Sequence, residues 1–242
     1  MRWHETTVTV VLDGSLGDLA RDASESVSNA IDTWMENAKV PDVQIDVSSE
    51  RGKAKRDGVN RIVAGPIDIP GHENDLALTM TYVDQDTGAI VESDMIINTK
   101  HRWNRIQPSR TEQVVEPDTR PGSSSKARGR EKALLHTTAC GQRFDVQNVV
   151  THELGHFFGL GEDVHDTEAS MYYKSRPCET KKRSLSSDDL SVMNALYEHP
   201  IADEQDDGAV GCSAVPSSKR SLGSWPWLMA LLATLTLARR RR

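Results

Sequence analysis

Hydrophobic and polar residues alternate in several short segments in the first part of the chain. The segment Thr7 to Asp13 alternates and is rich in Val and Thr, which predicts a β-strand. Further strands are expected at Val43 to Ser48, Val59 to Ala64, Leu76 to Val83 and Ala89 to Asn98. The last two strands are expected to pair, with their hairpin turning at Thr87 and Gly88.

Apolar residues at three- and four-residue spacing predict three amphipathic helices. The first helix follows the first strand, ends before Pro41, and has an apolar stripe made of Leu19, Ala23, Val27, Ala30, Ile31 and Trp34. The second is expected to begin after Asp145, a suitable N-cap, and to run to about Phe158. Gly159 follows it, and glycine can adopt the left-handed conformation that ends helices.

The third helix begins near Ser186 or Ser187. Asp188 and Asp189 lie in its first turn, where the helix dipole favours negative charge. Its expected buried face consists of Leu190, Met193, Leu196 and Tyr197.

Composition divides the chain into a folded body and appended segments. A chain of 242 residues allows one domain with a core, and we expect a catalytic domain over residues 1–200. Within it, residues 107–132 lack apolar periodicity and predict a mobile surface loop. Residues 201–221 are acidic and rich in small side chains, which is typical of a linker, and residues 222–242 form an apolar tail that ends in four arginines.

The charge balance argues against nucleic acid as a partner. The chain has 29 basic and 36 acidic residues, a formal charge of -7, and without the four terminal arginines the balance is 25 against 36, or -11. Phosphate contacts require basic patches, which an acidic body does not favour. We expect a monomer that binds protein or peptide.

A metal-binding motif lies within the second predicted helix. Residues 152–156 read His-Glu-Leu-Gly-His, which is the H-E-x-x-H pattern. Side chains four residues apart share a helical face, so His152 and His156 can bind one Zn²⁺ ion. Glu153 lies beside them, within reach of a zinc-bound water, and can act as the general base that activates this water for attack on a peptide bond.

The motif and its surroundings resemble the metzincins, and in particular the matrixin branch, over roughly Thr7 to Tyr197. The extended metzincin pattern is H-E-x-x-H-x-x-G-x-x-H followed by a turn that contains Met. Gly159 matches this pattern, and Ser170 to Tyr173 resembles the Met-turn, with Met171 beneath the metal. The resemblance implies an α+β fold with a twisted mixed sheet, packed helices and an active-site helix under a substrate cleft, and it implies the activity of a zinc-dependent endopeptidase.

The third zinc ligand differs from the metzincin pattern, because Glu162 occupies the position of the final His. Two His and one Glu form a known catalytic zinc set, so we predict Glu162 as the third ligand. Asp163 and His165 are alternatives nearby. Glu179 is a further alternative, which would make the site similar to that of thermolysin.

Cysteine usage and the tail indicate an exported protein. We interpret Cys140 and Cys178 as a disulfide, which requires an oxidising compartment, although two free thiols in the cytosol are the alternative. Residues 222–242, with Cys212 before them, resemble the myxobacterial C-terminal sorting tail, which implies lipid attachment at Cys212 and cell-surface display; an ordinary membrane anchor is the alternative. No signal peptide follows Met1, so we expect the natural protein to begin upstream.

Two other functions remain open at this point. A zinc-binding cell-surface module without activity would keep the metal site but not the chemistry. A metal-free adhesion or scaffold domain would keep the fold alone. Glu153 favours the enzyme, since a structural zinc site has no need of a carboxylate there.

Overall fold

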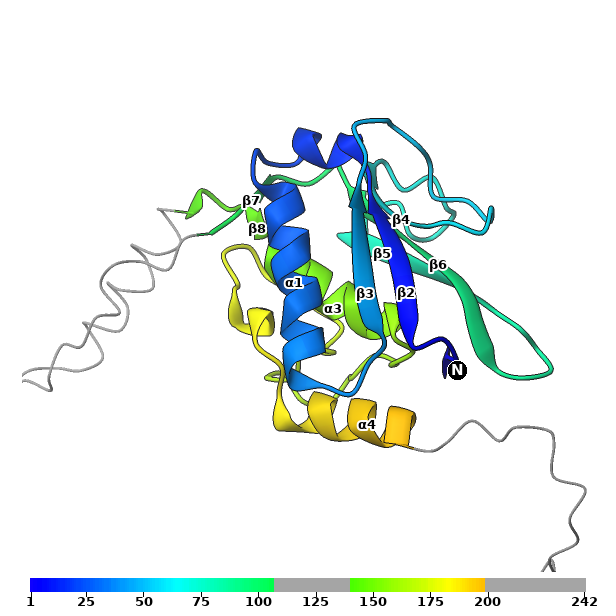
Figure 1. Ribbon diagram of the computed structural model, residues 1–242. Coiled ribbons are helices and arrows are strands. Elements are labelled where there is room, and N and C mark those ends of the chain that lie inside the picture. The colour runs from blue at the N-terminus through cyan, green and yellow to red at the C-terminus, as the bar shows by residue number, and fades with distance from the viewer. Residues whose placement is uncertain (107–139, 199–242) are drawn as a thin grey trace, which may run out of the picture. The chain divides into compact units, whose positions relative to one another are not determined.

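The computed structural model describes residues 1–106 and 140–198, which all belong to one unit, Met1–Ala202. The main sheet of this unit has the strand order β1-β6-β4-β2-β3 (Figure 1). Strand β5 is off this path and pairs with β6. The strands are β1 (Arg2–Trp3), β2 (Thr7–Leu12), β3 (Asp42–Val47), β4 (Asn60–Gly65), β5 (Ala77–Val83) and β6 (Ala89–Asn98). All pairs are parallel except β5 with β6. The expected mixed sheet is therefore confirmed, and β5 is an edge strand within the described part.

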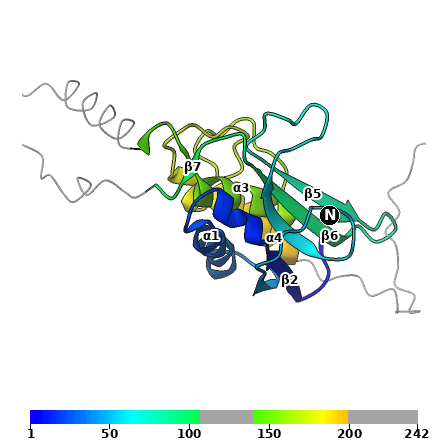
Figure 2. The same ribbon diagram turned by 90° about the horizontal axis from the view of Figure 1, so that it is seen from above.

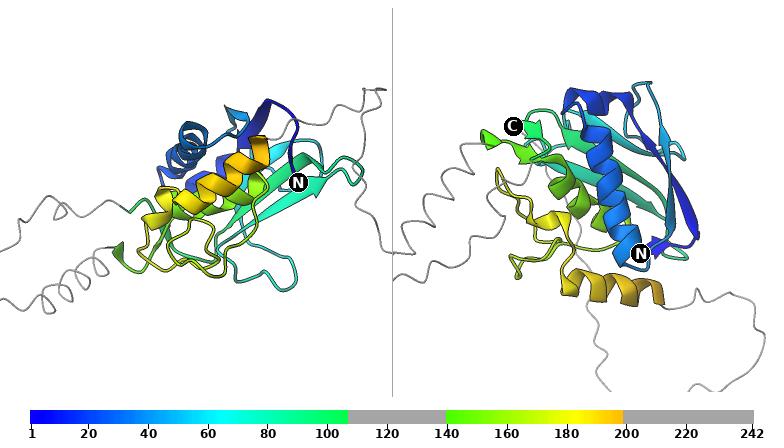
Figure 3. Two further views of the ribbon diagram at one scale, coloured as in Figure 1. Left: turned by 90° about the horizontal axis from the view of Figure 1, so that it is seen from below. Right: turned by 60° about the vertical axis from the view of Figure 1, so that its left-hand side comes forward.

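Two helices pack side by side against the sheet, α1 (Ala23–Asn37) and α3 (Val146–Phe157) (Figures 1 and 2). The apolar stripe of α1 is buried, and Trp34 at its end donates from Nε1 to the Thr151 carbonyl of α3 at 2.8 Å. The third helix, α4 (Ser187–Glu198), lies across the C-terminal ends of α1 and α3 (Figure 3). These helices and the mixed sheet give the α+β class that the sequence predicts.

The first helix begins later than its apolar spacing predicts. Leu19 lies outside α1 and directly follows a 3-10 helix, η1 (Gly14–Asp18). The Asp13 side chain accepts the Ser15 N–H at 2.9 Å and thereby starts η1. Leu19 is still buried, which explains why it matched the helical stripe although it belongs to the preceding turn.

The N-terminal residues are part of the core, which the sequence did not indicate. Trp3 is 4% exposed, and its indole Nε1 donates to the Phe157 carbonyl at 2.9 Å. Arg2 donates to the Leu196 carbonyl at 2.6 Å. The two-residue strand β1 therefore joins the sheet to the ends of α3 and α4.

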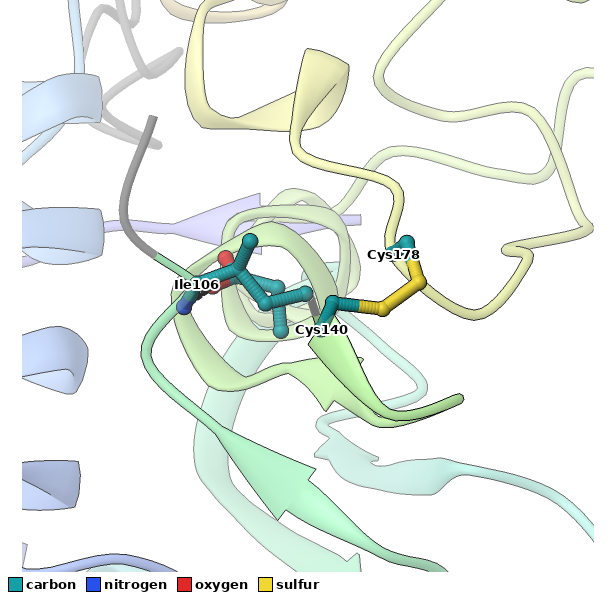
Figure 4. The surroundings of a disulfide bond; sticks show 4 residues. Ile106, Cys140 and Cys178 are labelled. Carbon is teal, nitrogen blue, oxygen red and sulfur yellow. Dashed lines mark hydrogen bonds between the residues drawn. A yellow bond between two sulfur atoms is a disulfide. The ribbon is translucent and has the colours of Figure 1, made fainter. Parts of the chain in front are cut away.

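A disulfide joins Cys140 to Cys178 and confirms the expected pairing (Figure 4). Ile106 is buried beside it, next to a small parallel pair formed by β7 (Trp103–Asn104) and β8 (Phe144–Asp145). The disulfide connects the segment before α3 to the segment between Met171 and α4. The second of these segments lines the site described below.

Several sequence predictions lie outside the described residues. They concern the loop at 107–132, the linker at 201–221, the tail at 222–242 and Cys212. Among the described helices, none is long and apolar enough to cross a membrane.

Candidate metal centre

Helix α3 begins where the sequence places it, because Asp145 caps its first turn. The Asp145 carboxylate accepts the Asn148 N–H at 2.8 Å, and Arg183 donates to the same carboxylate. The helix then presents His152 and His156 on one face, with ring centroids 4.9 Å apart. One helix turn thus holds two imidazoles at the edge of the core.

Both imidazoles are oriented by hydrogen bonds from their Nδ1 atoms. Nδ1 of His152 lies 2.8 Å from the Ser170 carbonyl, and Nδ1 of His156 lies 2.9 Å from the Leu160 carbonyl. A carbonyl only accepts, so each Nδ1 carries the proton and donates it. The Nε2 lone pairs are left available on both rings, as metal ligation requires.

Glu162 faces these two nitrogens. Its carboxylate oxygens lie 3.3 Å from Nε2 of His156 and 3.6 Å from Nε2 of His152. Within residues 1–106 and 140–198, these three side chains are the one group of His, Cys, Asp or Glu whose ligand atoms all lie within 4.8 Å of one another. Two neutral imidazole nitrogens and a carboxylate fit Zn²⁺, which is known with this ligand set.

The electrostatics of the group favour an ionised Glu162. Burial raises the pKa of Glu162, but when His152 and His156 are protonated, their Nε2 hydrogen bonds and charges outweigh burial and lower the pKa to about 2. Burial lowers the pKa of His156, but the Glu162 hydrogen bond and the Glu153 charge outweigh it, so the net shift is upward. The site therefore attracts a cation, whether a proton or a metal ion.

Gly159 brings Glu162 back toward the helix. Its φ is +106°, and the Leu160 N–H donates to the Gly155 carbonyl at 2.8 Å. A Cβ at Gly159 would overlap the Met1 carbonyl oxygen. The predicted helix-ending glycine thus has two causes, a left-handed backbone and a close neighbour.

The alternative third ligands lie elsewhere. Asp163 accepts the N–H groups of His165 and Asp166 at 2.6 and 3.0 Å and thereby shapes an exposed turn that carries His165. Glu179 accepts the Arg176 N–H at 3.2 Å. None of these three belongs to the group formed with the two imidazoles.

Glu153 lies beside the three residues and is fixed from the sheet. Its side chain is 7% exposed, and one carboxylate oxygen accepts the Thr79 hydroxyl of β5 at 2.7 Å. Sequence reasoning found Glu153 from the motif but missed Thr79. Thr79 is one of two Thr residues in this strand, so no local signal distinguishes it.

Met171 packs directly beneath α3. A Cβ added at Gly155 would overlap its Sδ atom, so glycine at this helical position permits the contact. The turn that contains Ser170 and Met171 is held by Asp189 of α4. The Asp189 carboxylate accepts the N–H groups of these two residues at 2.7 and 3.3 Å. The sequence placed Asp189 in a helix first turn but did not reveal that it binds this turn.

The site formed by His152, His156 and Glu162 opens into a cleft of about 820 Å³. One wall is the edge strand β5, from Ala77 to Thr81, and the floor includes Val149, His152, Glu153 and His156 of α3. Tyr173 to Ser175 and the buried Lys182 line another side. Burial lowers the pKa of Lys182, and the charges of Glu179, Glu162 and Glu153 oppose this shift.

Comparison with known proteins agrees with this geometry. The matrixin family model matches residues 2–198. Metalloendoproteinase 1 of Glycine max is 43% identical over 54 residues, and Metalloendoproteinase 1-MMP of Arabidopsis thaliana is 43% identical over 53 residues. Each aligned stretch covers 22% of this chain, but only 17% and 14% of the two relatives. Since the family model spans most of the chain, including every described strand and helix, the chain belongs to the matrixin family.

Proposed function

We propose that this protein is a zinc-dependent endopeptidase in which His152, His156 and Glu162 hold the metal and Glu153 is the general base. The observation that carries the proposal is the orientation of the two imidazoles. Both Nδ1 atoms donate to backbone carbonyls, so both Nε2 atoms face the Glu162 carboxylate inside an open cleft. Membership of the matrixin family supports the same function.

The residues of the chain divide the chemistry between them. Zinc bound by such a set acidifies water and polarises a carbonyl group. The Glu153 carboxylate accepts the proton of the attacking water and returns it to the leaving amine nitrogen, which completes hydrolysis of the peptide bond. Thr79 donates to one Glu153 oxygen at 2.7 Å and leaves the second oxygen for this proton.

Edge strand β5 supports a protein or peptide substrate. Within the described part, β5 pairs on one side only, with β6, and residues Ala77 to Thr81 line the cleft. An extended peptide can bind to a free strand edge through its own backbone. This mode places a peptide bond near Glu153 without requiring a particular sequence, which suits an endopeptidase.

The organisation and location of the protein are part of the same proposal. We propose a catalytic domain over 1–200 with a loop at 107–132, a linker over 201–221, and a sorting or anchor tail over 222–242. The disulfide between Cys140 and Cys178 supports an oxidising, exported location at the cell surface or outside the cell. We propose a monomer, and the acidic charge argues against binding to nucleic acid.

Digestion of casein by purified protein tests the activity. The wild type is expected to cleave casein and to lose this activity with a zinc chelator, whereas Glu153→Ala should keep its zinc and lose cleavage. Thr79→Val keeps the shape of the side chain but removes a hydrogen bond to a charged group, so kcat/KM should fall roughly tenfold or more. Asp68→Asn changes an exposed residue that does not line the cleft and is the control.

Other outcomes identify the rival functions. Zinc at one equivalent without cleavage by the wild type would indicate an inactive zinc-binding surface module. Absence of bound zinc after zinc addition would indicate a metal-free scaffold. Equal cleavage by the wild type and Glu153→Ala would overturn the role of Glu153.

A further inference from the structure

Lys182 is a buried cation without a carboxylate partner among the described residues. The residue is 1% exposed and lies on the short 3-10 helix η3 (Lys181–Arg183). The flanking residues are paired, since Lys181 Nζ lies 3.3 Å from Glu168 and Arg183 contacts Asp145. Within residues 1–106 and 140–198, no carboxylate oxygen lies within 4.0 Å of Lys182 Nζ.

The groups that contact the Lys182 ammonium are not carboxylates, and the charges of Glu179, Glu162 and Glu153 that favour the ammonium act from beyond ion-pair distance. Nζ donates to the Tyr172 carbonyl, and it lies 3.5 Å from Nδ1 of His152, which already donates to Ser170. A buried charge that makes no direct ion pair is costly to the folded state. A carboxylate that enters from outside the described fold would compensate it.

Lys182 lines the cleft immediately beside the metal group. We define the lysine recess as the part of the cleft formed by Val149, Tyr173, Lys174, Ser175 and Lys182. Val149 lies one helical turn before His152 and Glu153, so the recess adjoins the group that would act on the peptide bond. Lys174 adds a second positive charge, with Nζ 4.7 Å from the Tyr173 ring centroid.

We propose that Lys182 is a specificity-determining residue that selects substrates with a carboxylate side chain next to the scissile bond. The proposal rests on the proposed endopeptidase function and names its substrate class. An Asp or Glu side chain that enters the lysine recess gives Lys182 its missing ion pair in a low-dielectric environment. Apolar residues of the same size leave the ammonium unpaired.

Glu179 is the internal carboxylate with the strongest influence on Lys182, but it does not replace this partner. One of its oxygens accepts the Arg176 N–H at 3.2 Å, and Glu179 does not line the cleft. The backbone of Lys182 is already anchored, because its N–H donates to the buried Asn148 side chain at 2.9 Å. This backbone contact between η3 and α3 does not involve the ammonium.

Matched peptides test the proposal on the zinc-loaded full chain. The peptides carry Glu, Gln or Leu at each of the two positions that flank the scissile bond, and kcat/KM is measured for each. At one position, the wild type should cleave the Glu peptide roughly ten- to a hundredfold faster than the Gln peptide, since one hydrogen bond between charged groups is lost. Lys182→Met should cut both at the same rate, whereas Lys181→Met, which removes a neighbouring paired charge, should keep the preference.

A second measurement separates specificity from a purely structural role and from the proposed function. Lys182→Met should keep its zinc content and its melting temperature, because apolar replacement of a buried charge is often neutral or stabilising. A uniform loss of rate on all peptides, with the Glu to Gln ratio unchanged, would overturn the proposal. The Kd values of the same peptides for zinc-loaded Glu153→Gln give the preference for Glu over Gln in binding alone, without cleavage. If the wild type binds the Glu peptide selectively but cleaves no peptide, the proposed endopeptidase function is wrong and the proposal for Lys182 stands. If the wild type cleaves the peptides without preferring Glu, the endopeptidase function stands and the proposal for Lys182 is wrong.

Discussion

Asp94 makes the stability of this protein depend on pH in an unusual direction. Its side chain on β6 is fully buried, one carboxylate oxygen accepts the Arg61 N–H at 2.9 Å, and the other has no hydrogen-bond partner. Burial, together with the nearby charges of Glu92 and Asp57, raises the pKa of Asp94 from 3.8 to about 6. The folded protein therefore binds a proton here that the unfolded chain releases.

The direction and the size of the pH effect on stability follow from this difference in proton binding. Between pH 3.8 and about 6 the folded state holds more protons at Asp94 than the unfolded state, so stability falls as pH rises. A shift of about two units corresponds to about 3 kcal/mol in total. About 2 kcal/mol of it falls between about pH 4.5 and about pH 7.5.

Asp94→Asn removes this titration and keeps an oxygen for the Arg61 N–H. We expect the free energy of unfolding of the variant, relative to the wild type, to rise by about 2 kcal/mol from about pH 4.5 to about pH 7.5. Urea denaturation followed by tryptophan fluorescence measures it, with Asp68→Asn as an exposed control. Parallel pH curves for Asp94→Asn and the wild type would refute the reasoning.

Three further perturbations test the site and its supports. Glu162→Gln should weaken zinc affinity by more than the roughly ten- to hundredfold typical of losing an outer-shell partner, whereas Asp163→Asn should not, as competition with a chelating dye measures. Gly155→Ala places a Cβ on Met171 and should cost about 1–3 kcal/mol in thermal denaturation, with partial recovery when Met171→Ala is added. Cys178→Ser opens a disulfide with a sequence separation of 38. It should lower the free energy of unfolding by about 4 kcal/mol, and a reductant should then have no further effect.

Features set by neighbouring residues were predictable from the sequence. Helix α3 begins directly after its N-cap Asp145, and the left-handed Gly159 follows its C-terminal end, because caps depend on the local backbone alone. The spacing of His152 and His156 fixes their common face for the same reason. The start of α1 was wrong because apolar spacing also matches a buried residue in a preceding turn, as Leu19 shows.

Features that join distant segments had no comparable signal. Thr79 meets Glu153 only because β5 lies at the sheet edge above α3, and Asp189 meets Met171 only because α4 returns beneath the turn. The two-residue strand at Trp3 is too short for any periodicity. In each case the side chain is ordinary and the fold gives it a partner.

The position of Glu162 depends partly on neighbouring residues and partly on distant contacts. The sequence could therefore suggest it as the third ligand but left other candidate ligands open. Glu162 follows the helix closely, so the turn at Gly159 limits where it can lie. Within that limit, Asp163 is one residue further along and His165 three, so spacing alone left both as alternatives. What separates them is the turn that Asp163 itself builds by accepting the N–H groups of His165 and Asp166, which occupies one carboxylate oxygen and directs the chain outward. Hydrogen bonds that compete for the same carboxylates thus favour Glu162 as the proposed third ligand, and a motif records spacing but not that competition.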